Sequence, residues 1–194
     1  VNGTSTSSTD GNILLYATSG NITLETLSAG TASVSVTAAA TPTEATPNVG
    51  KIIDLDGTPS EDSENDITAS GVLLNAGNAI GDGANHLEIT VTTLTANTGA
   101  GGLFISAQEK ITSGTTNRGV TVDTLTVNVN RVSTSASHST TLYAAQADLT
   151  STGAGNIVLR STAGSIILND GDTNGADPDG TNGFAVKNTG SGNI

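Results

Sequence analysis

Short aliphatic runs separated by small polar residues recur along the chain, and the clearest of them follow the pattern Gly-x-Ile-x-Leu. Four copies of this cassette occupy residues 11–15, 20–24, 155–159 and 164–168, and a fifth begins at residues 192–194. Within each pair of copies the spacing is nine residues. An Ile and a Leu two positions apart point to the same face of a β-strand, and glycine permits the backbone of a tight corner. The cassette therefore predicts short strands joined by corners.

A second, looser pattern places one leucine between small polar residues. Its copies are centred on Leu27, Leu94, Leu125 and Leu149. The last three are separated by 31 and 24 residues, which is in or near the range for one turn of natural solenoid proteins. Apolar and polar residues also alternate in several runs, and this alternation predicts further strands. These runs are residues 34–36, 87–91, 120–122 and 125–129.

Together the patterns predict an all-β protein, a right-handed parallel β-solenoid (β-helix) of about six to eight coils with acidic loop insertions. We interpret residues 1–194 as a single solenoid segment that is part of a longer array or a filament subunit. The alternatives are a β-sandwich, a β-propeller and a disordered low-complexity linker. Sandwiches and propellers usually carry aromatic anchors, whereas this chain has two Phe, two Tyr and no Trp.

The charge of the chain limits its partners. Six Lys and Arg stand against eighteen Asp and Glu, which gives a net charge of −12 at pH 7. Nucleic acids and anionic lipids are bound through cationic side chains, so we expect no nucleic-acid partner. No apolar run approaches the roughly 20 residues that cross a bilayer, so we expect no membrane insertion. Cysteine is absent, which leaves hydrogen-bonded strands or calcium to stabilise a secreted domain.

Three polar insertions interrupt the strand pattern, at residues 38–50, 54–66 and 170–180. In the third, alternating oxygen side chains precede Gly175, as in the first half of an EF-hand-like calcium loop. The twelfth position of that loop is Thr181 where a bidentate Glu is expected, and two further aspartates are the candidates to compensate. The candidate metal ligands are Asp170, Asp172, Asn174, Asp177 and Asp179.

Calcium is therefore the candidate cofactor. The second insertion carries six acidic residues, Asp54 and Asp66 among them, and is a second candidate calcium site. The alternative for both insertions is that Asp, Asn and Gly serve only as corner residues that add solubility.

The chain resembles the filamentous-haemagglutinin-like secreted adhesins of bacteria. Residues 11–24, 149–159 and 163–168 carry the resemblance, and residues 94–105 are similar. The resemblance is one of composition as much as of position, and it covers about half of the chain. The resemblance implies a right-handed parallel β-helix, export across the outer membrane, and a role in attachment, biofilm formation or contact between cells. The chain departs from the family in its irregular coil lengths and in lacking a secretion-domain motif near the N-terminus, which fits an internal fragment and leaves the export route open.

These observations lead us to expect a structural or adhesive segment of a secreted bacterial surface protein, a rigid β-helical shaft that is extracellular or at the cell surface. The alternative is a self-assembling subunit of an extracellular filament that stacks end to end. The expected partners are copies of the same chain or adjacent repeats, and a host surface, a neighbouring cell surface or a glycan.

We do not expect an enzyme. Parallel β-helices that act on polysaccharides need paired carboxylates or a base in a groove, with aromatic residues to stack on sugars, and the aromatic and basic residues of this chain are scattered. His86 and His138 have no neighbouring Cys or second His. A polysaccharide-acting enzyme and an ice-binding solenoid are the less favoured alternatives, since the Thr-x-Thr spacing of Thr90 and Thr92 does not recur at a constant interval.

Overall fold

The computed structural model describes residues 6–8, 11–38, 50–55, 64–108, 110–112, 115–117, 119–132, 135, 137–142, 145–170 and 183–194. These residues form β-strands and the connections between them, with no helix among them. None of the described residues therefore belongs to a helix that could span a membrane.

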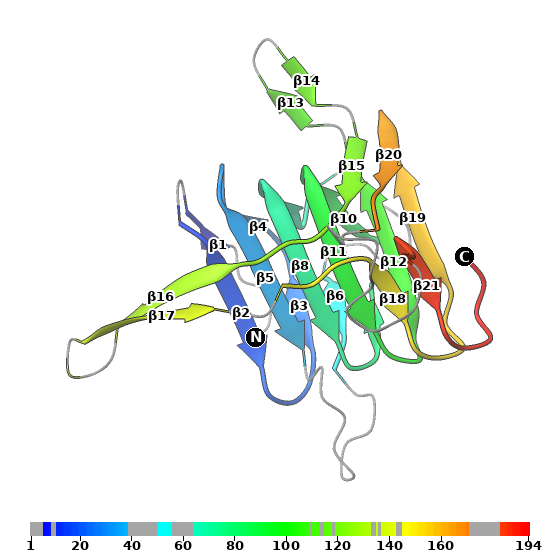
Figure 1. The fold of residues 1–194 in the computed structure, drawn as a ribbon, viewed down its shortest axis with the longest axis horizontal. Coiled ribbons are helices and arrows are strands. Elements are labelled where there is room, and N and C mark those ends of the chain that lie inside the picture. Colours follow the sequence, from blue (N-terminus) through cyan, green and yellow to red (C-terminus); the bar gives the residue numbers. More distant parts are fainter. Residues whose placement is uncertain are drawn as a thin grey trace.

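Most strands belong to two large sheets in which all neighbours are parallel (Figure 1). Sheet A has the order β1 (Thr6–Ser7), β4 (Leu27–Ser28), β7 (Ile67–Thr68), β10 (Leu87–Thr90), β12 (Gly102–Ala107), β9 (Ala79–Ile80), β6 (Ile52–Asp54) and β3 (Ile22–Leu24), and β19 (Ile157–Ser161) also pairs with β12. Sheet B has the order β2 (Ile13–Ala17), β5 (Ser33–Ala38), β8 (Gly71–Ala76), β11 (Thr93–Thr98), β15 (Gly119–Val122) and β20 (Ser165–Leu168). In the same sheet, β18 (Leu149–Ser151) pairs with β11 and with β21 (Val186–Asn188).

The prediction of a single right-handed solenoid of six to eight coils is wrong, because the strands form two large parallel sheets. Sheet B keeps sequence order from β2 to β20, but sheet A does not. The cause lies in β12, whose first half pairs with β9 while its second half pairs with β10, so two series of short strands merge into one sheet. The coarser prediction of an all-β protein built from parallel strands is confirmed.

Two antiparallel hairpins add strands outside the large sheets. The first pairs β13 (Lys110–Thr112) with β14 (Thr115–Asn117), and the second pairs β16 (Asn128–Val132) with β17 (His138–Leu142). Below the second hairpin, Leu125 and Gln146 exchange backbone hydrogen bonds, and the Gln146 side chain donates to the carbonyl of Leu74 in β8. In Figure 1 this hairpin extends past β2 at the end of the molecule where β1 lies.

The core consists of aliphatic side chains stacked in register across the sheets. In sheet B one such row runs through Ile13, Val34, Val72, Leu94, Val122 and Leu168. In sheet A another runs through Ile22, Ile52, Ile80, Leu103 and Ile157. Residues of both rows belong to one buried hydrophobic cluster. Because each aliphatic group packs on a similar group in the next strand, a narrow core is filled without large aromatic residues.

The asparagine of the cassette has a structural role that links neighbouring strands. The side-chain oxygen of Asn12 accepts a hydrogen bond from the backbone N–H of Ser33 at 2.8 Å, and that of Asn21 accepts one from Lys51 at 3.0 Å. Asn156 accepts one from the N–H of Asn193 at 2.9 Å. In each case the donor lies beside the asparagine in the next layer, so this residue satisfies a corner N–H that a strand ladder leaves unpaired.

Candidate functional site

The predicted calcium loop lies almost wholly outside the described residues. Asp170 is described, and it is exposed two residues after the end of β20. The other four candidate ligands, Asp172, Asn174, Asp177 and Asp179, lie outside the described residues. Calcium binding by this loop therefore stays a prediction.

If this loop binds calcium, we expect the ion to raise the melting temperature by about 2–4 °C relative to a chelator, since a ligand that binds only the folded state stabilises it. Differential scanning calorimetry with calcium, magnesium and chelator makes the measurement. The Asp170→Asn variant, which removes one candidate ligand at an exposed position, should reduce the shift. A calcium shift of less than roughly one degree would contradict the prediction.

The second insertion contributes two members of a buried acidic cluster. Asp54 ends β6, Asp66 directly precedes β7, and Glu88 lies in β10. All three are buried, and one carboxylate oxygen of each lies within 4.8 Å of the others. The pairing of Ile67 with Ile89 places Asp66 beside Glu88. Three other acidic residues of this insertion, Asp56, Glu61 and Asp62, lie outside the described residues.

A shared proton accounts for the geometry of this cluster. The pKa of Asp66 is raised from 3.8 to about 10, first by burial and then by the charge of Asp54, a side-chain hydrogen bond with Asp54 and the charge of Glu88. The backbone N–H of Glu88 donates to Asp66 Oδ2 at 2.7 Å and opposes this rise. Asp66 is therefore protonated at neutral pH and donates to Asp54, which is how two close buried carboxylates avoid carrying two charges.

Carboxylate oxygens are also the ligands that hard cations prefer. The proton on Asp66 explains how Asp54 and Asp66 can lie side by side while buried, and calcium binding at this cluster stays a prediction. Glu88 was missed by sequence reasoning because it alternates with Leu87 and Ile89, a pattern that places a charged residue in solvent. No local signal links Glu88 to the insertion, because β10 is the third strand after β7 in the chain and becomes its neighbour only in the sheet.

The histidine and arginine side chains near this region are engaged in packing and hydrogen bonds. The His86 ring lies 6.1 Å from the Phe104 ring, between centroids, and its pKa is lowered by burial and by the charge of Arg160. Arg160 Nη2 donates to Ser106 Oγ at 3.0 Å. The side chain of His138 lies outside the described part of the structure.

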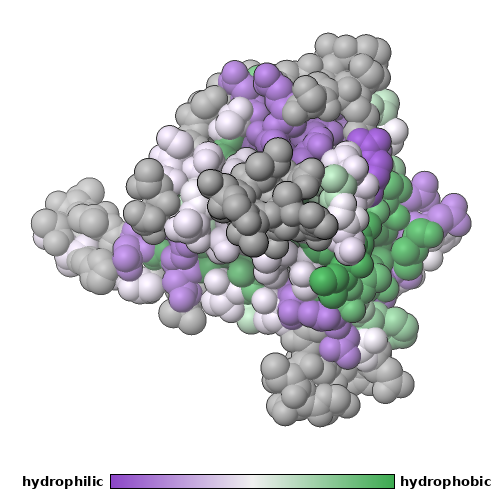
Figure 2. All heavy atoms as spheres, turned by 90° about the horizontal axis from the view of Figure 1, so that it is seen from above, coloured by the Kyte–Doolittle hydropathy of each residue, from purple (hydrophilic) through white to green (hydrophobic). Residues whose placement is uncertain are grey.

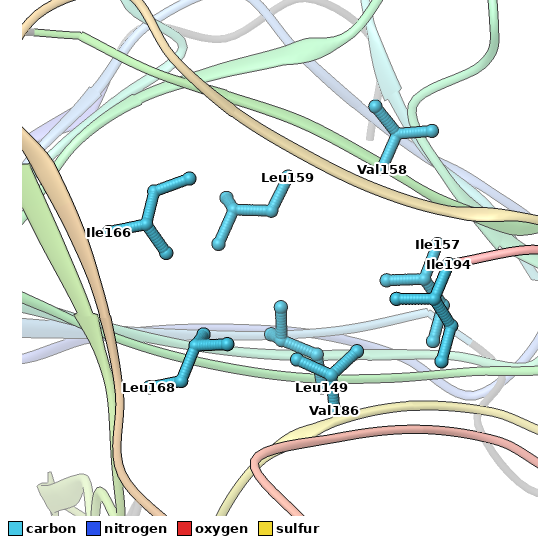
Figure 3. Close-up of a pocket in the computed structure, with 8 residues that line it drawn as sticks. All are labelled: Leu149, Ile157, Val158, Leu159, Ile166, Leu168, Val186 and Ile194. Carbon is cyan, nitrogen blue, oxygen red and sulfur yellow. The ribbon is translucent and has the colours of Figure 1, made fainter.

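At one end of the described structure the hydrophobic core is open to solvent. Figure 2 shows a hydrophobic patch at one end of the long axis, and Figure 3 shows the side chains that surround a pocket of about 340 Å³ there. We call this set the apolar end. It consists of Leu149, Ile157, Val158, Leu159, Ile166, Leu168, Val186 and Ile194.

The apolar end is exposed because its strands lie at the edges of the two sheets. Among the described strands β20 pairs only with β15, β21 only with β18, and β19 only with β12. Leu168 is 53% exposed and Ile194 is 74% exposed, whereas Val122, one strand further in, is fully buried. Exposed edge strands with contiguous apolar side chains are characteristic of surfaces that bind further strands.

A short segment already continues sheet A at this end. The N–H of Ile157 donates to the carbonyl of Asn193 at 2.9 Å, and Figure 3 shows Ile194 next to Ile157. Ile194 thus extends the aliphatic row of sheet A by one position.

Comparison of the chain with protein-family models, with curated proteins and with solved structures finds no match. The resemblance to secreted adhesins therefore stays a prediction.

Proposed function

We propose that the chain is a structural, adhesive segment of a secreted bacterial surface protein, and that it works by continuing its two parallel sheets into a neighbouring layer of strands. The observation that carries the proposal is the apolar end, where rows of aliphatic residues that are buried throughout the molecule reach an open edge. Isolated soluble domains normally cover or charge such an edge.

The remaining surface agrees with a structural role at the cell exterior. With eighteen acidic and six basic residues, the chain has a surplus of negative charge that keeps a protein soluble and separate from nucleic acid. The expectation of adhesion, and of a host surface, a neighbouring cell or a glycan as partner, comes from the family resemblance of the cassettes.

An antibody raised against the purified chain tests the proposal on intact cells of the source organism. We expect labelling of unpermeabilised cells, and we expect brief protease treatment of those cells to remove it. An antibody against a cytoplasmic protein is the control for cell integrity. Labelling that requires permeabilisation would overturn the proposal, since the chain would then lie inside the cell.

A further inference from the structure

We infer that the apolar end binds a second copy of the same chain, with β2 of the second copy pairing in parallel beside β20 and β21 of the first. This inference rests on the proposed function and names the partner of the same surface. It follows from the match between the two opposite edges of sheet B, β2 at one edge and β20 with β21 at the other (Figure 1).

Two aliphatic rows cross sheet B from edge to edge in register. The first begins at Ile13 and ends at Leu168. The second begins at Leu15, passes through Leu74 and ends at Val186. A second copy placed one strand spacing, about 4.8 Å, beyond β20 brings its Ile13 to Leu168 and its Leu15 to Val186. Both rows then continue with the same kind of side chain.

The spacing along the strands also agrees. Ile13 and Leu15 are two residues apart on one strand, whereas Leu168 and Val186 come from two different strands. Their partners in the next layer, Val122 and Leu149, pair with Leu94 and Ala96, which are again two residues apart. The two segments β20 and β21 therefore present one continuous edge to β2.

The outward face next to the second row supplies a specific contact. Tyr16 of β2 is 59% exposed, and its row passes through Thr37, Asn75, Asn97 and Thr150 to Lys187. In the stacked arrangement Tyr16 of the second copy lies beside Lys187, whose ammonium is 5.5 Å from the Phe184 ring. An ammonium between two aromatic rings is favoured by cation–π attraction.

The same placement of the second copy also continues sheet A. Ile194 extends the aliphatic row of this sheet beyond Ile157, and a second copy places its Ile22, at the opposite edge of sheet A, next to Ile194. The 74% exposure of Ile194 is thereby removed.

Charge at the two ends is locally complementary. Arg160 and Lys187 are two of the six basic residues, and both lie on the strands of the apolar end, whereas the exposed Glu25 follows β3 at the opposite edge of sheet A. This local attraction opposes the repulsion between two chains of net charge −12. Because salt screens the long-range repulsion more than close contacts, association should strengthen with ionic strength.

Sedimentation velocity over a range of concentrations and salt tests the association. We expect wild-type chains to form species larger than a monomer, and we expect Leu168→Glu to weaken the association more than about tenfold by placing a carboxylate in the contact. Ile167→Glu is the matched control, because Ile167 is 51% exposed but pairs with Thr121 on the opposite face of β20 and does not line the pocket. Melting curves of both variants confirm folding.

Cross-linking tests the register. The chain has no cysteine, and neighbouring residues of paired strands lie within the Cα separation of a disulfide, roughly 4.4–6.8 Å. Lys187→Cys mixed with Tyr16→Cys should form a covalent heterodimer under mild oxidation. Lys187→Cys mixed with Thr23→Cys, which places the thiol on β3 of sheet A, should form far less.

A wild-type chain that stays monomeric at high concentration and salt overturns the inference, and so does equal weakening by the two glutamate variants. Equal cross-linking of both cysteine mixtures also overturns it. If intact cells show surface labelling but the purified chain stays monomeric, the proposed function stands. The apolar end is then assigned to strands of another segment or protein. If the purified chain associates but intact cells show no surface labelling, the contact between copies stands and the proposed function is overturned.

Discussion

Replacing Asp66 by asparagine should abolish the fall in the free energy of unfolding with rising pH between pH 5 and 8, and should raise this free energy at pH 8 by about 2–4 kcal/mol. The wild-type protein should behave differently, becoming less stable as the pH rises through this range. Both expectations follow from the proton that Asp66 holds in its buried position.

The sign of the effect follows from counting protons. In the folded protein the pKa of Asp66 is about 10, so the carboxyl stays protonated, whereas in the unfolded chain the ordinary value of 3.8 leaves it ionised above pH 5. The folded state therefore binds one more proton, and its stability is greatest at the acidic end and falls with rising pH, by up to about 1.4 kcal/mol per pH unit. Asparagine needs no proton, and its amide can accept from Glu88 N–H and donate to Asp54.

Urea denaturation followed by circular dichroism at several pH values measures this effect. Asp170→Asn is the control, since it makes the same chemical change at an exposed position and should leave the wild-type pH dependence intact. A wild-type protein that becomes more stable from pH 5 to pH 8, or an Asp66→Asn variant that keeps the wild-type slope, would show that Asp66 is ionised in the folded state.

The second large effect is expected at Gly102, where an alanine should cost about 3–5 kcal/mol of unfolding free energy. Gly102 has a φ of +89°, and a Cβ there would lie 2.5 Å from the carbonyl oxygen of Asn156. That oxygen accepts the N–H of Leu103 at 2.8 Å. A methyl group would therefore force β12 away from the corner before β19 and break this hydrogen bond.

Gly20→Ala separates the two causes. Gly20 has a similar φ of +78°, but a Cβ at this position would meet no atom within 4 Å. The free energy of unfolding of this variant should fall only by the cost of placing alanine in a left-handed backbone conformation, about 1–2 kcal/mol. Thermal and urea denaturation of both variants gives the comparison. Similar losses at Gly20 and Gly102 would mean that the close approach to Asn156 has no energetic importance.

The local elements of the fold could be predicted from the sequence, but their pairing could not. The cassettes at residues 11–15 and 155–159 give the strands Ile13–Ala17 and Ile157–Ser161, because alternation and glycine corners are local signals. Which edges meet depends on contacts between distant residues. The merger of two strand series through β12 has no counterpart in the spacing of the cassettes, and this is why the predicted single solenoid is wrong.

The buried acidic cluster shows a similar limit. Asp54 and Asp66 belong to an insertion that the sequence marks as acidic, whereas Glu88 is buried only because the fold covers its strand. A polar residue in an alternating strand is predicted to be exposed. The prediction holds only where no other part of the protein packs on that face of the strand. In the same way, Ile166 and Leu168 have the sequence of a core strand, and their position at the edge of sheet B exposes them.

Sheet B follows the chain from β2 at one edge to β20 and β21 at the other, so the two tips of the molecule are unlike. One tip ends in an aliphatic surface that includes Leu168, and the other carries the exposed ring of Tyr16. A fibre built from such units would have two different ends, and a subunit altered at one tip would stop its growth. Leu168→Glu subunits should then join an existing fibre through β2 and halt its further growth at the opposite tip.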